Sequence, residues 1–433
     1  MVKRCQRIGL LTKRFYTDLL LLGGCFGSMV FTSWAQVPVN RISIHREGNQ
    51  VGIQFEGRLE RASSIEGPWV DLSAEESPFV VQPSESMTFF RVASDGETGI
   101  FDRQEVTHLV LKGPFQKHFD LAFAGLPDGI FPPVREKPYF DGTLSHKGLE
   151  LPVRIRVRGN SSLQECPFPK LKVKVSRKVR EGTPFENARE WKIGSHCAEG
   201  GKGNIGRLRE ERSTFREAVV YEAMQTLGFL SPRVRRAHIT YQDTSDLGNP
   251  ERTGWLLTRM AFVFDHVEVL AEGLGGRALE DEEVAALTDA GFPELLIAEL
   301  QLFHALIGNW DYQLSQDGKG LWNTEVIEMP DKTLVPVAGD FDLSSWVTGT
   351  VRVNAPRDFM PELEDVERHF RFELSRIRTA FGEDLFSDAT QRFLGFRAGM
   401  ENLLALAEVD EEGREFMRQH VTMFYDLIET DLR

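Results

Sequence analysis

Three aspartates in the second half of the chain have the types and spacing that phosphoryl transfer requires. Asp311 ends a run of apolar residues with helical spacing, and Asp340 and Asp342 follow two strand-like segments, 321–329 and 334–338. In such a reaction one carboxylate orients the attacking hydroxyl and accepts its proton, while another holds the divalent cation that bridges the phosphates. Asp311 and Asp340 occupy places of this kind, on two loops joined by a hairpin.

The elements that position these acids change in type along the chain. Alternating apolar segments between turn-rich stretches predict a small all-β antiparallel module over 36–98. Mixed strands and helices follow, and the tail from 364 onward is amphipathic helix. The expected strands are 106–111, 151–158, 171–175, 238–241 and 255–258, and the expected helices are 212–227, 281–290 and 293–306. This order predicts an α+β fold with a two-lobed, kinase-like domain over 101–433.

The order of several short motifs resembles the spore-coat protein H (CotH) family of secreted atypical protein kinases. The matching motifs cover about residues 105–350 and are Arg158-Gly159-Asn160-Ser161-Ser162, Pro169-Lys170-Leu171-Lys172-Val173-Lys174, Arg216, Asn309-Trp310-Asp311 and Asp340-Phe341-Asp342. The resemblance implies that Asp311 is the catalytic base. It also implies that Asp340, supported by Asp342, binds Mg²⁺ or Mn²⁺.

The resemblance further implies a nucleotide site upstream of the acids, with Arg158 and a lysine on the phosphates of ATP. Lys170, Lys172 and Lys174 share one face of a strand because side chains alternate with a period of two, and we favour Lys172. An acid of the following helix would pair with that lysine. We favour Glu222, which shares the apolar face of the predicted helix.

One position departs from the kinase pattern. Kinase-type loops place an asparagine five residues after the catalytic aspartate to bind a second metal ion, and this chain has Gln316 there. Gln316 has the same amide oxygen on a longer side chain, Asp317 is an alternative ligand, and loss of activity is a third outcome. The resemblance therefore predicts either a kinase that transfers the γ-phosphoryl of ATP to protein hydroxyls or an inactive, kinase-like scaffold at the cell surface.

A phosphatase of the haloacid dehalogenase type is the other enzyme class to weigh. The segment 334–344 mimics a strand that ends in Asp-x-Asp-x-Ser, but that motif normally opens its fold at the first strand. Here it comes late in the chain, without partner acids on a parallel-sheet pattern. The protein substrate of a kinase does not follow from the sequence.

The N-terminus predicts export. A basic start, an apolar run over 19–31 and the small residue Ala35 are typical of a signal peptide over 1–35, and the apolar run is too short to span a bilayer. Lipid attachment at Cys25 is an alternative. We expect a secreted or periplasmic protein with no membrane span in the mature chain.

Composition narrows the class of partner. The net charge of −14 disfavours nucleic acid and anionic lipid as partners. Removal of the leader leaves Cys166 and Cys197, which in an oxidising compartment predict one disulfide, with two free thiols as the alternative.

Overall fold

The computed structural model divides the chain into two compact units, Met1–Thr98 and Gly99–Arg433. In the first unit it describes seven strands. In the second it describes residues 99–431 except 103–104, 125–136, 160–162, 164–165, 167, 197–210, 250, 288–290, 315–320, 350, 353–358 and 361–362. Cys197 and Gln316 therefore lie outside the described residues.

The first unit contains two small antiparallel sheets. Their strand orders are β1-β7-β4-β5 and β2-β3-β6. The strands are β1 (Leu20–Leu22), β2 (Ile42–Glu47), β3 (Gln50–Phe55), β4 (Arg58–Ala62), β5 (Val70–Asp71), β6 (Phe79–Val81) and β7 (Thr88–Ala93). The edge strand β1 belongs to the predicted signal peptide and pairs with β7. The rest of that segment lies outside the described residues, so its cleavage stays a prediction.

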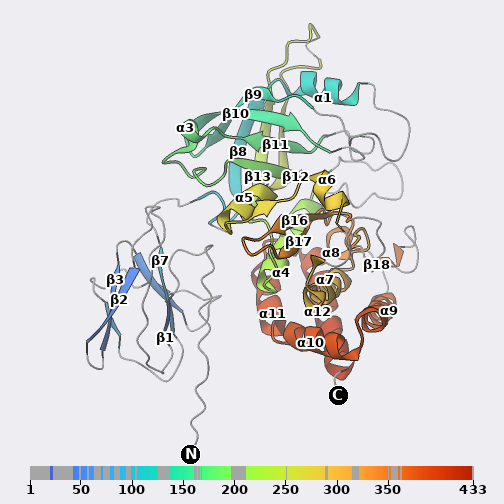
Figure 1. Ribbon diagram of the computed structural model, residues 1–433. Coiled ribbons are helices and arrows are strands. Elements are labelled where there is room, and N and C mark those ends of the chain that lie inside the picture. Colours follow the sequence, from blue (N-terminus) through green and yellow to red (C-terminus); the bar gives the residue numbers. More distant parts are fainter. Residues whose placement is uncertain are drawn as a thin grey trace, which may run out of the picture. The chain divides into compact units, whose positions relative to one another are not determined.

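The second unit begins with a closed seven-stranded barrel, ordered β10-β11-β12-β14-β13-β8-β9 (Figure 1). Its strands are β8 (Thr107–Gly113), β9 (Phe140–His146), β10 (Leu149–Val157), β11 (Leu171–Lys174), β12 (Glu190–Ser195), β13 (Val234–Asp243) and β14 (Leu256–Asp265). Only the β8–β13 pair among them is parallel. Alternation along β10 buries Val153, Ile155 and Val157 inside the barrel and turns the residues between them outward.

Helix α4 (Ser213–Thr226) connects the barrel to the helical part of this unit. Every residue from Ser213 to Met224 is buried, because the helix packs on β13 and β14 on one side and on α8 (Ser345–Thr348) and α11 (Arg397–Leu406) on the other. A helix that is enclosed in this way buries polar residues as well as apolar ones. Two of them, Glu217 and Glu222, belong to the candidate site discussed below.

The remainder of the second unit is mainly helical. The long helices are α7 (Glu294–Ile307), α9 (Leu363–Phe381), α10 (Glu383–Leu394) and α12 (Glu411–Asp431). The short elements of the second unit are α1 (Phe115–Phe123), α3 (Arg177–Arg180), α5 (Val267–Gly273), α6 (Asp281–Ala285), β15 (Arg277–Ala278), β18 (Val351–Arg352) and β19 (Phe359–Met360). Figure 1 shows α9 to α12 gathered at the end of the unit away from the barrel. Their apolar faces form one core with α4 and α7.

Two chain segments bring the predicted acids toward the barrel. Helix α7 ends at Gly308, whose left-handed backbone (φ 62°) turns the chain into the segment with Asp311. The hairpin of β16 (Thr324–Glu328) and β17 (Leu334–Ala338) leads to Asp340 and Asp342. The carbonyl of Gly308 accepts hydrogen bonds from the Ser345 amide (3.1 Å) and hydroxyl (3.3 Å), so the two loops are tied together.

Several sequence predictions can be compared with these elements. The helices predicted at 212–227 and 293–306 match α4 and α7 closely, and the mixed α/β composition is as expected. The strands β13 and β14 are much longer than the predicted 238–241 and 255–258. Strands β9 and β12 and helices α1 and α5 were not predicted.

Two expectations about the mature chain concern cysteines and membranes. Cys166 is buried and disulfide-bonded, but Cys197 lies outside the described residues, so its pairing with Cys166 stays a prediction. Among the described residues no helix has the length and apolar character that a membrane span requires.

We predict that Gly308→Ala destabilises the protein by about 2–4 kcal/mol, because a β-carbon there meets left-handed strain and lies 2.6 Å from Ser345 Cβ. Gly182→Ala is the matched control, since Gly182 has a similar φ of 67° with no atom within 4 Å of an added β-carbon. Urea unfolding measures both variants. Equal losses for the two glycines would contradict the predicted contact with Ser345.

Candidate active site

Lys170 lies between the two carboxylates that follow β17. Its Nζ is 3.0 Å from Asp340 Oδ1 and 3.1 Å from Asp342 Oδ2, and the lysine itself is buried, with 9% of its surface exposed. Lys170 immediately precedes β11, and its carbonyl accepts a hydrogen bond from the Arg158 amide at the end of β10 (2.8 Å). The end of these two barrel strands therefore meets the Asp-Phe-Asp segment of the helical part.

A third acid, Glu217 of α4, borders this cluster. Burial, followed by the neighbouring Asp342, raises the pKa of Glu217 to about 8 against the opposing effect of Lys170. Burial also raises the pKa of Asp342 to about 6, whereas Lys170 holds the pKa of Asp340 below its usual value. Although burial acts to lower the pKa of Lys170, Asp340 and Asp342 raise it. At neutral pH Glu217 is therefore mostly protonated beside an ion-paired lysine.

The backbone around Asp340 is held in an uncommon conformation. Asp340 has a φ of 55°, a left-handed value that non-glycine residues adopt rarely and that is found at functional sites. Its amide donates a hydrogen bond to the Tyr221 hydroxyl (3.2 Å) on α4. The next residue, Phe341, is fully buried and packs edge-on against Tyr221 and Phe303. These contacts turn both aspartates toward Lys170.

Asp311 is anchored by its own neighbourhood. Its Oδ1 accepts a hydrogen bond from Trp322 Nε1 (3.1 Å), and its Oδ2 accepts one from Asn323 Nδ2 (3.0 Å). Asn323 also donates to the Asp311 carbonyl (2.7 Å) and accepts from the amide of Gly339 (2.9 Å), just before the second loop. The Asp311 charge contributes to the raised pKa of Asp342, so all three predicted aspartates belong to one electrostatic cluster.

A buried polar chain supports Asp311 from α7. The Asp311 amide donates to Asn309 Oδ1 (3.1 Å), and Asn309 Nδ2 lies 3.1 Å from His304 Nδ1. The His304 ring stacks on Tyr312 with 3.6 Å between centroids, and Arg376 of α9 donates to the Tyr312 hydroxyl (3.2 Å). Burial lowers the pKa of His304 to about 3, so the ring is neutral and Nδ1 can accept the Asn309 amide proton.

Two of the predicted nucleotide residues have other partners. Lys172 pairs with Glu190 of β12 and lies 3.0 Å from His266 Nε2, whereas Lys170 meets the aspartates. Glu222 pairs with Arg236 of β13, and Glu217 is the α4 acid that borders the lysine. Glu217 and Glu222 lie five positions apart, about 140° around the helix, so they face different neighbours. Lys172 and Glu222 therefore do not pair with each other in the structure, and Glu217 is the α4 acid whose charge acts on Lys170. Which lysine binds a nucleotide stays a prediction.

Several site residues were not found from the sequence. Glu217 has one signal, its spacing of four from Tyr221, which places both on the face of α4 that meets Asp340. Asn323 and Trp322 have no comparable pattern, because they reach Asp311 from an isolated bridge before β16. His304 has no sequence signal either, because it lies within the apolar run that predicts the helix. Gln316 lies outside the described residues.

The residues around Asp340 suit a hard cation only in part. Within the described ranges no group of three or more His, Cys, Asp and Glu side chains is arranged to hold a metal ion. Asp340 and Asp342 nevertheless present carboxylate oxygens, which Mg²⁺ and Mn²⁺ prefer, toward one shared cation, the Lys170 ammonium group. Phosphate oxygens of a bound nucleotide are the kind of ligand that would complete such a set.

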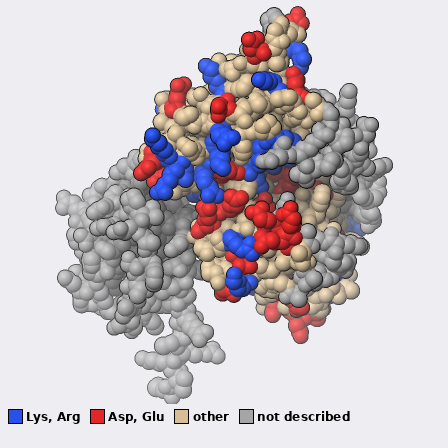
Figure 2. Space-filling model, turned by 45° about the horizontal axis from the view of Figure 1, so that its top comes forward, with Lys and Arg blue, Asp and Glu red and all other residues tan. Residues whose placement is uncertain are grey.

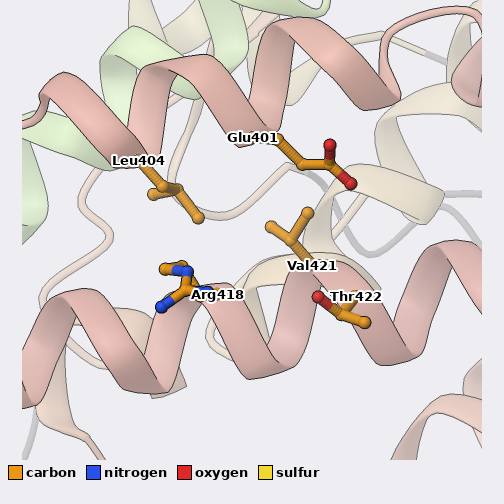
Figure 3. A pocket seen from close by; sticks show the side chains of 5 residues that line it. All are labelled: Glu401, Leu404, Arg418, Val421 and Thr422. Carbon is orange, nitrogen blue, oxygen red and sulfur yellow. The ribbon is translucent and has the colours of Figure 1, made fainter.

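A pocket in the helical part has no role in this cluster. Figure 3 shows it between α11 and α12, lined by Glu401, Leu404, Arg418, Val421 and Thr422. The charged residues there already have partners, since Glu401 pairs with Arg397 (3.1 Å) and Arg418 pairs with Glu415 (2.8 Å). None of the predicted site residues lines this pocket.

Comparison with known proteins leaves the family open. No family model and no curated protein matches the chain. Among solved structures, a crystal structure of the Helicobacter pylori proinflammatory kinase CtkA shares 9% identity, with 61% of this chain and 94% of that chain covered and a TM-score of 0.29. A likeness of this size does not establish a common fold.

We predict that His304→Gln removes part of the acid sensitivity of the protein. The pKa of His304 is about 3 in the folded chain and 6.5 ordinarily, so its contribution to stability is present above pH 6.5 and is lost as the pH falls toward 3. Between pH 7 and pH 4 the parent should lose on the order of 3 kcal/mol more than the variant in urea unfolding. The comparison cancels the contributions of His369 and His420, whose pKa values are also lowered. A stability difference that stays constant with pH would contradict a buried neutral His304.

Proposed function

We propose that the chain is a kinase-like phosphotransferase that moves the γ-phosphoryl group of ATP to a protein hydroxyl. The observation that carries the proposal is the Lys170 ammonium group between Asp340 and Asp342, at the meeting of barrel and helical part. This arrangement joins a cation for phosphate to carboxylates for metal, with Asp311 in the same electrostatic cluster. The CotH-like order of motifs supports the same reading, and membership of that family is part of the proposal.

In this proposal each residue has a defined task. Asp311 orients the acceptor hydroxyl and takes its proton while the hydroxyl oxygen bonds to the γ-phosphorus, the bond from phosphorus to the bridging oxygen breaks and ADP leaves. Lys170 and Arg158 bind phosphate oxygens. Asp340 and Asp342 would hold Mg²⁺ or Mn²⁺, which neutralises charge on the phosphates. Trp322 and Asn323 fix the Asp311 carboxylate and leave further lone pairs to accept the proton.

Glu217 acts in this proposal as a positioning residue for the lysine. Its carboxyl group is mostly neutral at pH 7, so it borders Lys170 without adding a third full negative charge to the cluster. Asp340 and Asp342 would be the residues that hold a metal ion, and Glu217 would then be the acid beside Lys170 that offers it a counter-charge.

A non-catalytic, kinase-like scaffold is the second candidate, favoured by one specific observation. Lys170 occupies both aspartates, and no three-acid metal arrangement is present among the described residues. The phosphatase alternative fits less well, because β17 lies in a three-stranded antiparallel sheet with β15 and β16 rather than at the end of a parallel strand.

Export by the predicted leader completes the proposal, and N-terminal sequencing of the product recovered outside the cytoplasm tests it.

We predict that the purified chain labels itself, or an added protein, with the γ-phosphate of ATP in the presence of Mg²⁺ or Mn²⁺. Asp311→Asn and Asp340→Asn should each lower the labelling rate by at least about 10²-fold, since a positioned base or metal ligand contributes that much. Asp331→Asn is the matched control, because Asp331 caps the exposed turn between β16 and β17. Label that survives both site substitutions would refute these roles. No label and no metal-dependent nucleotide binding would favour the scaffold.

A further inference from the structure

Cations are crowded on one part of the outer face of the barrel. The strand register places Arg156 of β10 directly opposite Lys172 of β11, and Lys172 opposite Lys192 of β12. The next row toward the aspartates holds Arg158 beside Lys170, whose backbones are hydrogen-bonded (2.8 Å). Like charges directly opposite each other on a sheet are destabilising. Lys and Arg side chains gather on the barrel side of the face that Figure 2 shows, next to a group of Asp and Glu.

The lysines of these two rows have acidic partners. Lys170 pairs with Asp340 and Asp342, Lys172 with Glu190, and Lys192 with Glu325 of β16 (3.0 Å). Arg156 and Arg158 differ. Neither makes an ion pair with any residue that the structure describes, and the buried Nε atoms of both donate no hydrogen bond there. The charge of Arg158 still acts on Asp340 and Glu217, so the positive charge in excess over these pairs is concentrated on Arg156.

Both guanidinium groups are held by aromatic rings instead of carboxylates. Arg156 lies 4.9 Å from the centre of the Tyr139 ring, and Arg158 lies 5.5 Å from that of Phe264. Stacking of this kind orients the plane of an arginine and leaves its N–H groups free for a bidentate anion. Arg156 lies on β10 and Arg158 directly follows its last residue, so their backbones are about 7 Å apart.

The positive charges of these rows act on two neighbouring groups. Burial and then the charges of Lys192, Lys172 and Arg158 together lower the pKa of His266 to about 2. The pKa of Lys137 is also lowered, by burial and by Arg156. An anion at this place would relieve the repulsion among these groups. The acidic residue on the next strand, Asp141, lies opposite Arg154 rather than Arg156, one row farther from the site.

We propose that Arg156, with Arg158 beside it, forms a subsite for a chain of condensed phosphates on the outer face of the barrel. A chain bound there has one end beside Lys170 and the Asp340–Asp342 pair and runs along β10 toward Tyr139. The anion subsite rests on the charges and contacts above, whereas the choice of phosphate over carboxylate rests on the proposed function. A nucleoside triphosphate and inorganic polyphosphate both carry this chemistry.

The test compares Arg156→Gln with Arg154→Gln. Arg154 is the matched control, because it lies on the same strand and face, stacks on the same Tyr139 ring at 4.9 Å, and has Asp141 as its cross-strand neighbour. Arg156→Gln should weaken the binding of inorganic triphosphate by roughly tenfold or more, as expected for a charge-assisted hydrogen-bonded pair. Arg154→Gln should change it by less than about twofold. Calorimetry with and without Mg²⁺ measures both.

Thermal unfolding separates this effect from a loss of structure. Without ligand, the midpoint of Arg156→Gln should equal or exceed that of the parent, because the substitution removes a positive charge opposite Lys172. Triphosphate should raise the unfolding midpoint of the parent and of Arg154→Gln. It should raise the midpoint of Arg156→Gln much less. Equal stabilisation of all three proteins overturns the subsite.

Further probes identify the source and the class of anion. ATP bound more tightly than triphosphate assigns the subsite to a nucleotide, and long-chain polyphosphate bound more tightly than ATP assigns it to inorganic phosphate. Polyglutamate binding that Arg156→Gln weakens as much as triphosphate binding overturns the proposal in favour of an acidic protein segment. Arginine-dependent triphosphate binding without phosphotransfer keeps the subsite and refutes the kinase. Phosphotransfer combined with triphosphate binding that does not depend on Arg156 supports the kinase and refutes the subsite.

Discussion

The ion pair of Lys170 with Asp340 and Asp342 is the contact on which the arrangement of the second unit depends. The lysine belongs to the barrel and the aspartates to the helical part, so the charges meet only when both parts are folded and packed. Two carboxylates this close, with Glu217 beside them, repel each other in a buried place unless a cation is present. Lys170 supplies that cation, and Glu217 stays mostly protonated next to it.

Helix α4 contacts both this cluster and the barrel. Glu217 and Tyr221 face the aspartates, and Glu222 faces Arg236 on the barrel. Near its start the buried Arg216 forms a bidentate pair with Asp410, just before α12, at 2.8 and 2.6 Å. A shift of the C-terminal helices would therefore move α4, and with it the side chains that hold the Asp340 backbone.

The sequence predicted the aspartates and the segment with the lysines, because acids after a hairpin and lysines at a period of two are local patterns. It did not distinguish Lys170 from Lys172, since both lie on one strand face and only packing decides which row meets β17. It favoured Glu222 because that residue shares the apolar side of its helix, a criterion that fails when α4 is buried on all sides. Asn323 and His304 act through contacts that have no periodic signal. The strand β9 was missed because Gly142 stands at a core-facing position, and β12 was missed because it offers only two core apolar residues, Trp191 and Ile193.

The unfavourable features of the second unit lie on both sides of the same cluster. On the barrel side, cations stand opposite cations although the whole chain carries a net charge of −14. On the helical side, Asp340 keeps a left-handed backbone and Asp342 shares a buried place with other acids. Each feature costs stability by itself, and a fold retains such costs where the surrounding packing enforces them. A ligand that places negative charge on the barrel face and a cation at the aspartates would reduce the repulsion on both sides. A metal-bound phosphate chain has this distribution of charge.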